Sequence, residues 1–170
     1  MEKLKVLRYF AYTIEILVFY MVQETPGLVP DLFGARPVLL IPIALSIAMF
    51  EKETAAMAFG LLCGLLIDFG AGGVLGFHGL LLSVICYSVG LIAANLIQTN
   101  FLTAMITAVI STAGIVLLQW VFFYLLFSYS HAAYALTAHY IPRFLYTTAF
   151  MPVAYYFNRA LALQIRTKEE

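Results

Sequence analysis

Few side chains in the 170-residue chain are of the kinds that catalyse reactions or hold metal ions. Asp31 and Asp68 are its two aspartates, and neither belongs to a paired-carboxylate motif. The three histidines, His78, His131 and His139, fall at or beyond the ends of apolar runs. No His-Glu-x-x-His, Gly-x-Ser-x-Gly or Walker sequence is present. The sequence therefore predicts a protein that is not an enzyme and that carries no metal or cofactor site.

Asp68 is the ionisable residue whose position needs the most explanation. It stands where an apolar run ends, just before the glycine-rich turn that starts at Gly70. A carboxylate at the C-terminal end of a helix is electrostatically unfavourable. We therefore expect a cation beside Asp68, and Arg36 or Arg143 can supply it at the same end of the molecule.

Small residues recur every three or four positions in the two apolar runs that flank this turn. Residues four apart lie on one face of a helix, so these residues form a continuous groove. In a membrane such grooves allow two helix backbones to approach closely. The short turn makes the two helices antiparallel neighbours, and simple close packing is enough to explain the pattern. The expected helix-packing residues are Ala56, Gly60, Gly64, Gly79, Ser83 and Gly90.

Composition defines the broad class. The chain is 64% hydrophobic and 11% charged, with a mean hydropathy of +0.96, whereas soluble domains have about 45–50% and about 25%. The net charge is zero and no basic patch is present, so a nucleic-acid partner is not expected. Cys63 and Cys86 fall inside apolar runs, which argues against a disulfide framework. We predict an all-α integral membrane protein surrounded by the lipid bilayer.

Six apolar segments approach the roughly 20 residues that span a bilayer. Glu15 lies in the middle of the first, and no Ala-x-Ala site follows it, so we expect a retained helix rather than a signal peptide. A single transmembrane domain covering 1–170 is predicted. Its six spans are about 7–23, 36–50, 54–69, 75–96, 101–128 and 141–163.

The basic residues predict the orientation in the membrane. Cytoplasmic loops carry an excess of Lys and Arg. With a cytoplasmic N-terminus, only Arg36 and Arg143 lie outside. Six spans then bring the C-terminus back to the cytoplasm. The inner group is Lys3, Lys5, Arg8, Lys52, Arg159, Arg166 and Lys168.

Polar residues form a stripe on the first helix. Arg8, Tyr12, Glu15 and Gln23 fall within about 80° of one another on a helical wheel. Such a stripe should face protein, because a carboxylate at membrane depth is costly. Glu15 is either part of a ligand pocket or transport route, or a packing residue that is protonated or hydrogen-bonded. With one such acid, we favour packing.

Aromatic residues gather in the second half of the fifth segment and in the loop after it. Aromatic residues at membrane interfaces usually anchor the helix at headgroup level. The alternative is a docking surface for another membrane helix. The candidate partner-binding residues are Trp120, Phe123, Tyr124, Phe127, Tyr129 and Tyr134.

The central part of the chain resembles the rod shape-determining protein MreD family. The resemblance covers about 36–92 and rests on three motifs. They are Arg36-Pro37 before an apolar helix, Phe59-Gly60-x-x-x-Gly64-Leu-Leu-x-Asp68, and Gly73-x-x-Gly76-x-His78 before a helix that reaches Gly90. Val38 departs from the pattern, since many relatives have an acidic residue after the proline, so no carboxylate acts at that position here.

The resemblance implies a non-enzymatic scaffold subunit of the bacterial cell-elongation machinery in the cytoplasmic membrane. It would bind an MreC-like bitopic protein and support rod shape and peptidoglycan synthesis. Other membrane proteins of that machinery, and a second copy of the chain, are further implied partners. The family is similar in fold to the six-helix substrate-binding subunits of energy-coupling-factor vitamin transporters.

That similarity defines the alternative function, a vitamin-binding transporter subunit. Those subunits commonly present Ala-x-x-x-Ala on their first helix to the coupling partner. Here Ala11 is followed four residues later by Glu15, which disfavours the transporter. A small membrane enzyme, the third class, lacks a nucleophile or a metal cluster.

Overall fold

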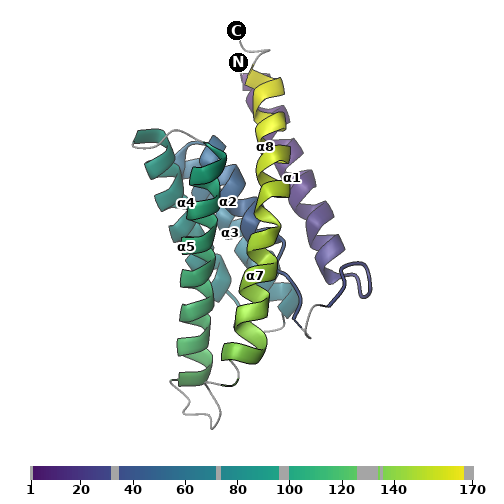
Figure 1. Ribbon diagram of the computed structural model, residues 1–170. Coiled ribbons are helices and arrows are strands. Elements are labelled where there is room, and N and C mark those ends of the chain that lie inside the picture. Colours follow the sequence, from purple (N-terminus) through teal and green to yellow (C-terminus); the bar gives the residue numbers. More distant parts are fainter. Residues whose placement is uncertain are drawn as a thin grey trace.

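A computed structural model describes residues 2–31, 35–71, 74–95, 100–125, 134 and 136–166. Every regular element in these ranges is a helix, and the helices form one bundle (Figure 1). The α-helices are α1 (Glu2–Glu24), α2 (Leu40–Phe50), α3 (Glu53–Ala71), α4 (Phe77–Asn95), α5 (Phe101–Trp120), α7 (Ile141–Ala149) and α8 (Met151–Arg166). Two π-helical segments, Val121–Leu125 and Leu136–Tyr140, lie between α5 and α7.

The start of α1 and the end of α8 lie side by side at one end of the bundle (Figure 1). The turn between α2 and α3 belongs to the same end, because Glu51 in that turn pairs with Arg8 of α1. The arginines of the predicted outer group lie elsewhere: Arg36 and Arg143 line one cavity at the other end. Arg8 of the predicted inner group thus lies at the opposite end of the bundle from Arg36 and Arg143 of the predicted outer group.

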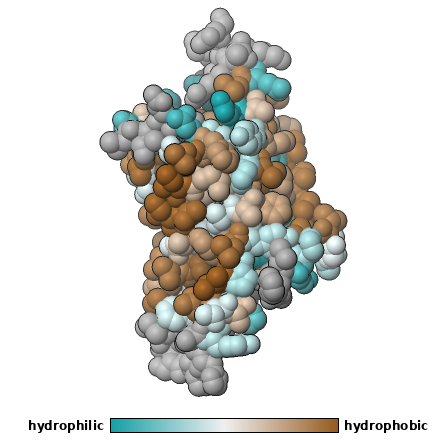
Figure 2. Space-filling model, viewed as in Figure 1, coloured by the Kyte–Doolittle hydropathy of each residue, from teal (hydrophilic) through white to brown (hydrophobic). Residues whose placement is uncertain are grey.

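Four helical stretches are long and apolar enough to cross a membrane: Lys5–Glu24, Glu53–Gly70, Phe77–Asn95 and Phe101–Phe123. Only 22–33% of their apolar windows is buried inside the bundle, so most of their surface needs lipid around it. Figure 2 shows apolar side chains gathered over the face that α4 and α5 form. The prediction of an all-helical membrane protein is confirmed at this level, while the six-span single domain stays a prediction.

The second predicted span is the centre of the bundle. α2 contacts α1, α3, α4, α5, α7 and α8, and Leu40 to Met49 are all buried. Its 11 residues measure about 16 Å, roughly half of the ~30 Å hydrocarbon thickness. A short helix that is apolar all round has to be covered by protein. α2 is therefore the core helix around which the longer ones pack.

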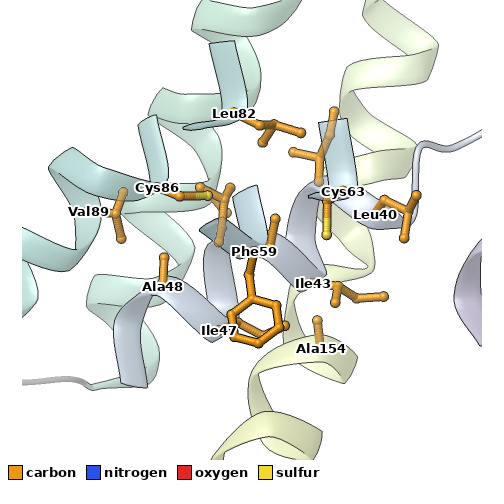
Figure 3. Packing of buried hydrophobic residues seen from close by; sticks show 14 of the residues in the cluster. Leu40, Ile43, Ile47, Ala48, Phe59, Cys63, Leu82, Cys86, Val89 and Ala154 are labelled. Carbon is orange, nitrogen blue, oxygen red and sulfur yellow. The ribbon is translucent and has the colours of Figure 1, made fainter. Parts of the chain in front are cut away.

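The core shows how α2 is covered. Figure 3 shows Ile43 and Ile47 of α2 in one cluster with Phe59 of α3 and Ala154 of α8. Cys63 belongs to the same buried cluster and, like Cys86, is a free thiol. Inside a bilayer these contacts stabilise the bundle through close van der Waals packing, because lipid tails are as apolar as the side chains themselves.

Two prolines change the predicted boundaries. The helix of the second predicted span, 36–50, starts later than expected: α2 begins at Leu40, so Pro42 lies in the first turn, where its missing N–H leaves no intrahelical hydrogen bond unmade. The last predicted span, 141–163, is two helices. Pro152 has no N–H to continue the helical hydrogen-bond pattern, so the helix is interrupted at Phe150. α7 and α8 still form one continuous column (Figure 1).

Candidate functional site

The backbones of α3 and α4 approach each other closely at two glycines of α3. A Cβ placed on Gly60 would lie 2.7 Å from the carbonyl oxygen of Leu82, and one on Gly64 would lie 2.5 Å from the Cα of Gly79. Any larger residue at either glycine would push the two backbones apart. The small-residue faces of α3 and α4 therefore meet at these glycines.

The far end of the same interface is almost as tight. A Cβ on Gly90 would lie 2.9 Å from the Cα of Glu53 and 3.2 Å from the Cβ of Ala56. Gly79 has slightly more room, with Leu65 at 3.2 Å. Ser83, the remaining predicted residue of the α4 face, is half-buried.

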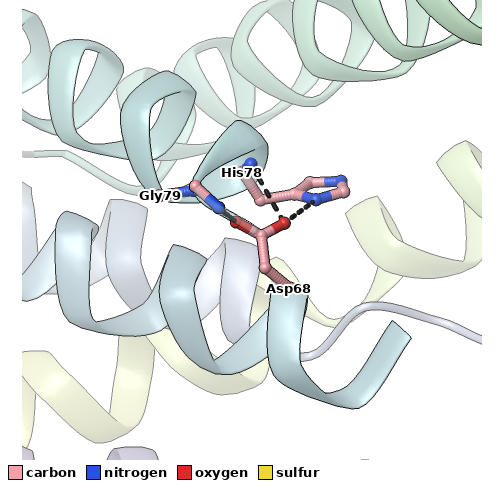
Figure 4. Close-up of polar contacts among 4 residues, drawn as sticks. Asp68, His78 and Gly79 are labelled. Atoms are coloured by element: carbon pink, nitrogen blue, oxygen red, sulfur yellow. Dashed lines mark hydrogen bonds and ion pairs between the residues drawn. The ribbon is translucent and has the colours of Figure 1, made fainter. Parts of the chain in front are cut away.

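Asp68 caps the start of α4 rather than pairing with an arginine (Figure 4). Its Oδ2 accepts hydrogen bonds from the backbone N–H groups of Gly76 at 2.8 Å and Gly79 at 3.2 Å. Its Oδ1 accepts from the backbone N–H of His78 at 3.2 Å and lies 2.7 Å from His78 Nδ1. The carboxylate therefore satisfies amides that an α-helix leaves unpaired at its N-terminus.

The predicted ion pair with Arg36 or Arg143 is wrong. Arg36 pairs with Asp31 at 2.9 Å, and no ion pair joins either arginine to Asp68 in the structure's described ranges. The charge at the end of α3 is compensated instead by the positive end of the α4 dipole. The physical requirement was correct, but its source is the neighbouring helix.

A signal for this arrangement was present in the sequence. Helices usually begin with a Ser, Thr, Asp or Asn cap. The residues before α4 are Val74, Leu75 and Gly76, none of which offers such a side chain. Gly76 has a φ of +94°, a left-handed conformation that favours glycine and that turns its N–H toward Asp68.

Three residues of the predicted polar stripe of α1 are buried, and the fourth, Gln23, is half-buried. Arg8 and Glu15 are 7% and 5% exposed, and Tyr12 is fully buried against the ring of Phe59. Arg8 Nε lies 2.6 Å from Glu51 Oε1 at the turn between α2 and α3. Sequence reasoning placed the stripe against protein but did not identify Glu51 as its partner.

Glu15 is held by a buried amide from the other end of the chain. Asn158 Nδ2 of α8 donates to Glu15 Oε1 at 2.9 Å and to Ser46 Oγ of α2 at 2.6 Å. The same nitrogen lies 3.1 Å from the carbonyl oxygen of Ala154. These contacts tie α1, α2 and α8 together, which fits the expectation of a hydrogen-bonded packing residue.

The aromatic segment that follows α5, Val121–Leu125, packs partly against α4. Phe123 packs edge-on against Phe77 at 5.3 Å and Phe122 does so at 5.8 Å, so this end of α5 rests on the start of α4. Phe122 is nevertheless 49% exposed and Tyr134 is 70% exposed. The side chain of Tyr124, and Phe127 and Tyr129, lie outside the described residues.

The comparisons with known proteins identify the family. The family model of the rod shape-determining protein MreD matches residues 4–162. No match was found among the curated proteins or among the solved structures. The matched range extends well beyond the 36–92 of the resemblance and includes helices on both sides of the α3–α4 hairpin. The chain therefore belongs to the MreD family of rod shape-determining membrane proteins.

Proposed function

We propose that this protein is a non-enzymatic scaffold of the bacterial elongation machinery that binds an MreC-like bitopic protein and so supports peptidoglycan synthesis. The match to the MreD family over residues 4–162 carries this proposal. The partner's single spanning helix would dock in lipid, where association rests on van der Waals packing and a few hydrogen bonds.

Two exposed aromatic residues that follow α5, Phe122 in the segment Val121–Leu125 and Tyr134 further along the chain, are the proposed docking surface. Phe122 is 49% exposed and Tyr134 is 70% exposed, and large rigid rings provide contact area at low conformational cost. Phe123 is a supporting residue in this proposal, since it packs on Phe77 within the chain. The rigid α3–α4 hairpin would hold this surface in place through Phe77 at the start of α4.

The proposed membrane is the bacterial cytoplasmic membrane, with both termini in the cytoplasm. The end of the bundle that holds Arg8 and Lys52 would face inward under the positive-inside rule. The Asp68 cap and the aromatic surface would then lie at the outer side. A partner whose main domain is outside the membrane could reach both.

The test is co-purification from a rod-shaped host in mild detergent, together with depletion, which should give rounded cells. The variant Phe122→Ala with Tyr134→Ala should recover less MreC-like partner while the protein remains folded. Leu102→Ala is the matched control, because Leu102 is 70% exposed on the opposite end of α5. Unchanged recovery in the double variant would place the contact elsewhere, and loss of recovery in the control would point to general instability.

A further inference from the structure

A cavity of about 170 Å³ lies at the end of the bundle opposite the chain termini. It is formed by the ends of α1 and α3, the start of α7 and the segment that leads into α2. Gln23, Glu24, Arg36, Gly70 and Arg143 are among its lining residues. Its location at the ends of apolar helices corresponds to the level of lipid headgroups.

Arg143 also lines this cavity, and it forms no ion pair with any residue in the described ranges. Arg36 is engaged with Asp31 at 2.9 Å. Arg143 Nε, in contrast, is buried without a hydrogen-bond partner among the residues that the structure describes. A buried guanidinium N–H that lacks an acceptor is costly, and a phosphate oxygen is a preferred acceptor for it.

Acceptor oxygens line the same cavity. Gln23 Oε1 is buried and has no hydrogen-bond donor within the described ranges. The Glu24 carboxylate receives a single long contact, 3.5 Å from Gln23 Nε2. It rests on Gly70, where any Cβ would collide with it. The lining of the cavity thus combines a guanidinium with a carboxylate and an amide oxygen.

We propose that this cavity binds the phosphoethanolamine headgroup of a zwitterionic phospholipid. The phosphate would accept from Arg143, and the ammonium would donate to Glu24 and to Gln23 Oε1. The volume suits a headgroup, since pockets for drug-sized ligands occupy about 300–1,000 Å³. A headgroup without an ammonium, such as that of phosphatidylglycerol, would also satisfy Arg143, but it offers the two acceptors neutral hydroxyls and no cation to pair with the Glu24 carboxylate.

Native mass spectrometry of the protein in mild detergent tests this directly. Phosphatidylethanolamine and phosphatidylglycerol with identical acyl chains are titrated separately. The ethanolamine lipid should bind about twofold to fivefold more tightly, the range that one partly exposed charge pair supplies. Arg143→Gln should weaken both lipids, whereas Glu24→Gln should remove the preference. Lys52→Gln, an equal loss of charge at the other end, should leave both affinities unchanged.

Equal binding of the two lipids to the wild-type protein overturns the proposal. It is also overturned if Arg143→Gln binds both lipids as tightly as the wild-type protein does. If Arg143→Gln does not fold, Glu24→Gln still decides, because Glu24 is exposed at the end of α1. Soluble O-phosphoethanolamine that binds as tightly as the lipid would overturn the lipid as occupant. Weaker binding of the soluble compound supports the lipid, and none of these results depends on the protein partner.

Discussion

His78 Nδ1 lies 2.7 Å from Asp68 Oδ1, and this contact joins the last turn of α3 to the first turn of α4. Both side chains are nearly buried, with 10% and 2% of their surfaces exposed. The same carboxylate accepts three backbone hydrogen bonds, one from Gly76 just before α4 and two from His78 and Gly79 in its first turn. Together with the close approach at Gly60 and Gly64, the contact makes the hairpin a rigid unit at the end that carries the proposed docking surface.

Asp68→Ala should destabilise the protein by roughly 1–3 kcal/mol, because it leaves buried amides at the start of α4 without an acceptor. Asp31→Ala is the control: Asp31 pairs with Arg36 on the surface, where an ion pair contributes about 0–1 kcal/mol. Thermal unfolding in detergent measures both. A midpoint for Asp68→Ala equal to that of Asp31→Ala would mean that the cap contributes little.

Gly64→Ala should lower the unfolding midpoint, since the added Cβ would meet the backbone of Gly79 at 2.5 Å and neither helix can yield cheaply. Overpacking of this kind costs about 1–3 kcal/mol. Gly114→Ala in α5 is the matched control, because nothing lies within 4 Å of a Cβ there. It should be neutral or slightly stabilising, as alanine favours helix. Equal unfolding midpoints for the two variants would show that close packing at Gly64 does not limit stability.

Sequence reasoning predicted the helices and their packing faces well where the signal was local. The apolar runs of α1, α3 and α4 end within a few residues of their predicted limits. The small-residue spacing around Gly60 and Gly64 correctly indicated which faces meet. The stripe of Arg8, Tyr12 and Glu15 was correctly turned toward protein, because burial of polar residues away from lipid is a property of the helix face alone.

Long-range partners could not be predicted in the same way. Glu15 is held by Asn158, which lies 143 residues away, and no spacing rule relates the two. The central position of α2 was missed because a membrane-facing helix and a buried one are both apolar. The one hint of burial was that its predicted span, 36–50, is shorter than the roughly 20 residues that cross a bilayer. For Asp68, the expected compensation was assigned to a side chain, although an uncapped neighbouring helix was the closer source.

The ion pair between Arg8 and Glu51 predicts a non-additive pair of substitutions. Both side chains are nearly buried, with 9% and 2% exposed. Arg8→Met leaves a buried carboxylate without its cation and should cost about 3–5 kcal/mol. Combining it with Glu51→Leu removes that charge, so the double variant should be more stable than Arg8→Met alone. A double-mutant cycle from unfolding midpoints measures the coupling, and strict additivity would contradict the pairing.

Asn158→Ala should destabilise the bundle by roughly 1–3 kcal/mol, because Glu15 and Ser46 lose a common buried donor. Asn95→Ala is a close control. Both amides donate to the carbonyl four residues earlier, at 3.1 Å for Asn158 and 3.0 Å for Asn95, but Asn95 is exposed. The difference between the two variants therefore isolates the contacts with α1 and α2. Similar unfolding midpoints would show that those contacts are not stabilising.

The proposed orientation predicts which exposed positions react from outside the cell. Leu28 is 60% exposed and follows α1 at the end of the bundle that holds the cavity. Lys52 is also exposed, but it lies in the turn beside Arg8 at the other end. The native thiols of Cys63 and Cys86 are fully buried, so they can stay in place and the parent protein should remain unlabelled. A membrane-impermeant maleimide on intact cells should label Leu28→Cys and spare Lys52→Cys, and both should react after permeabilisation. Labelling of Lys52→Cys in intact cells would contradict the proposed orientation. It would mean that the Asp68 cap and the aromatic surface lie on the cytoplasmic side.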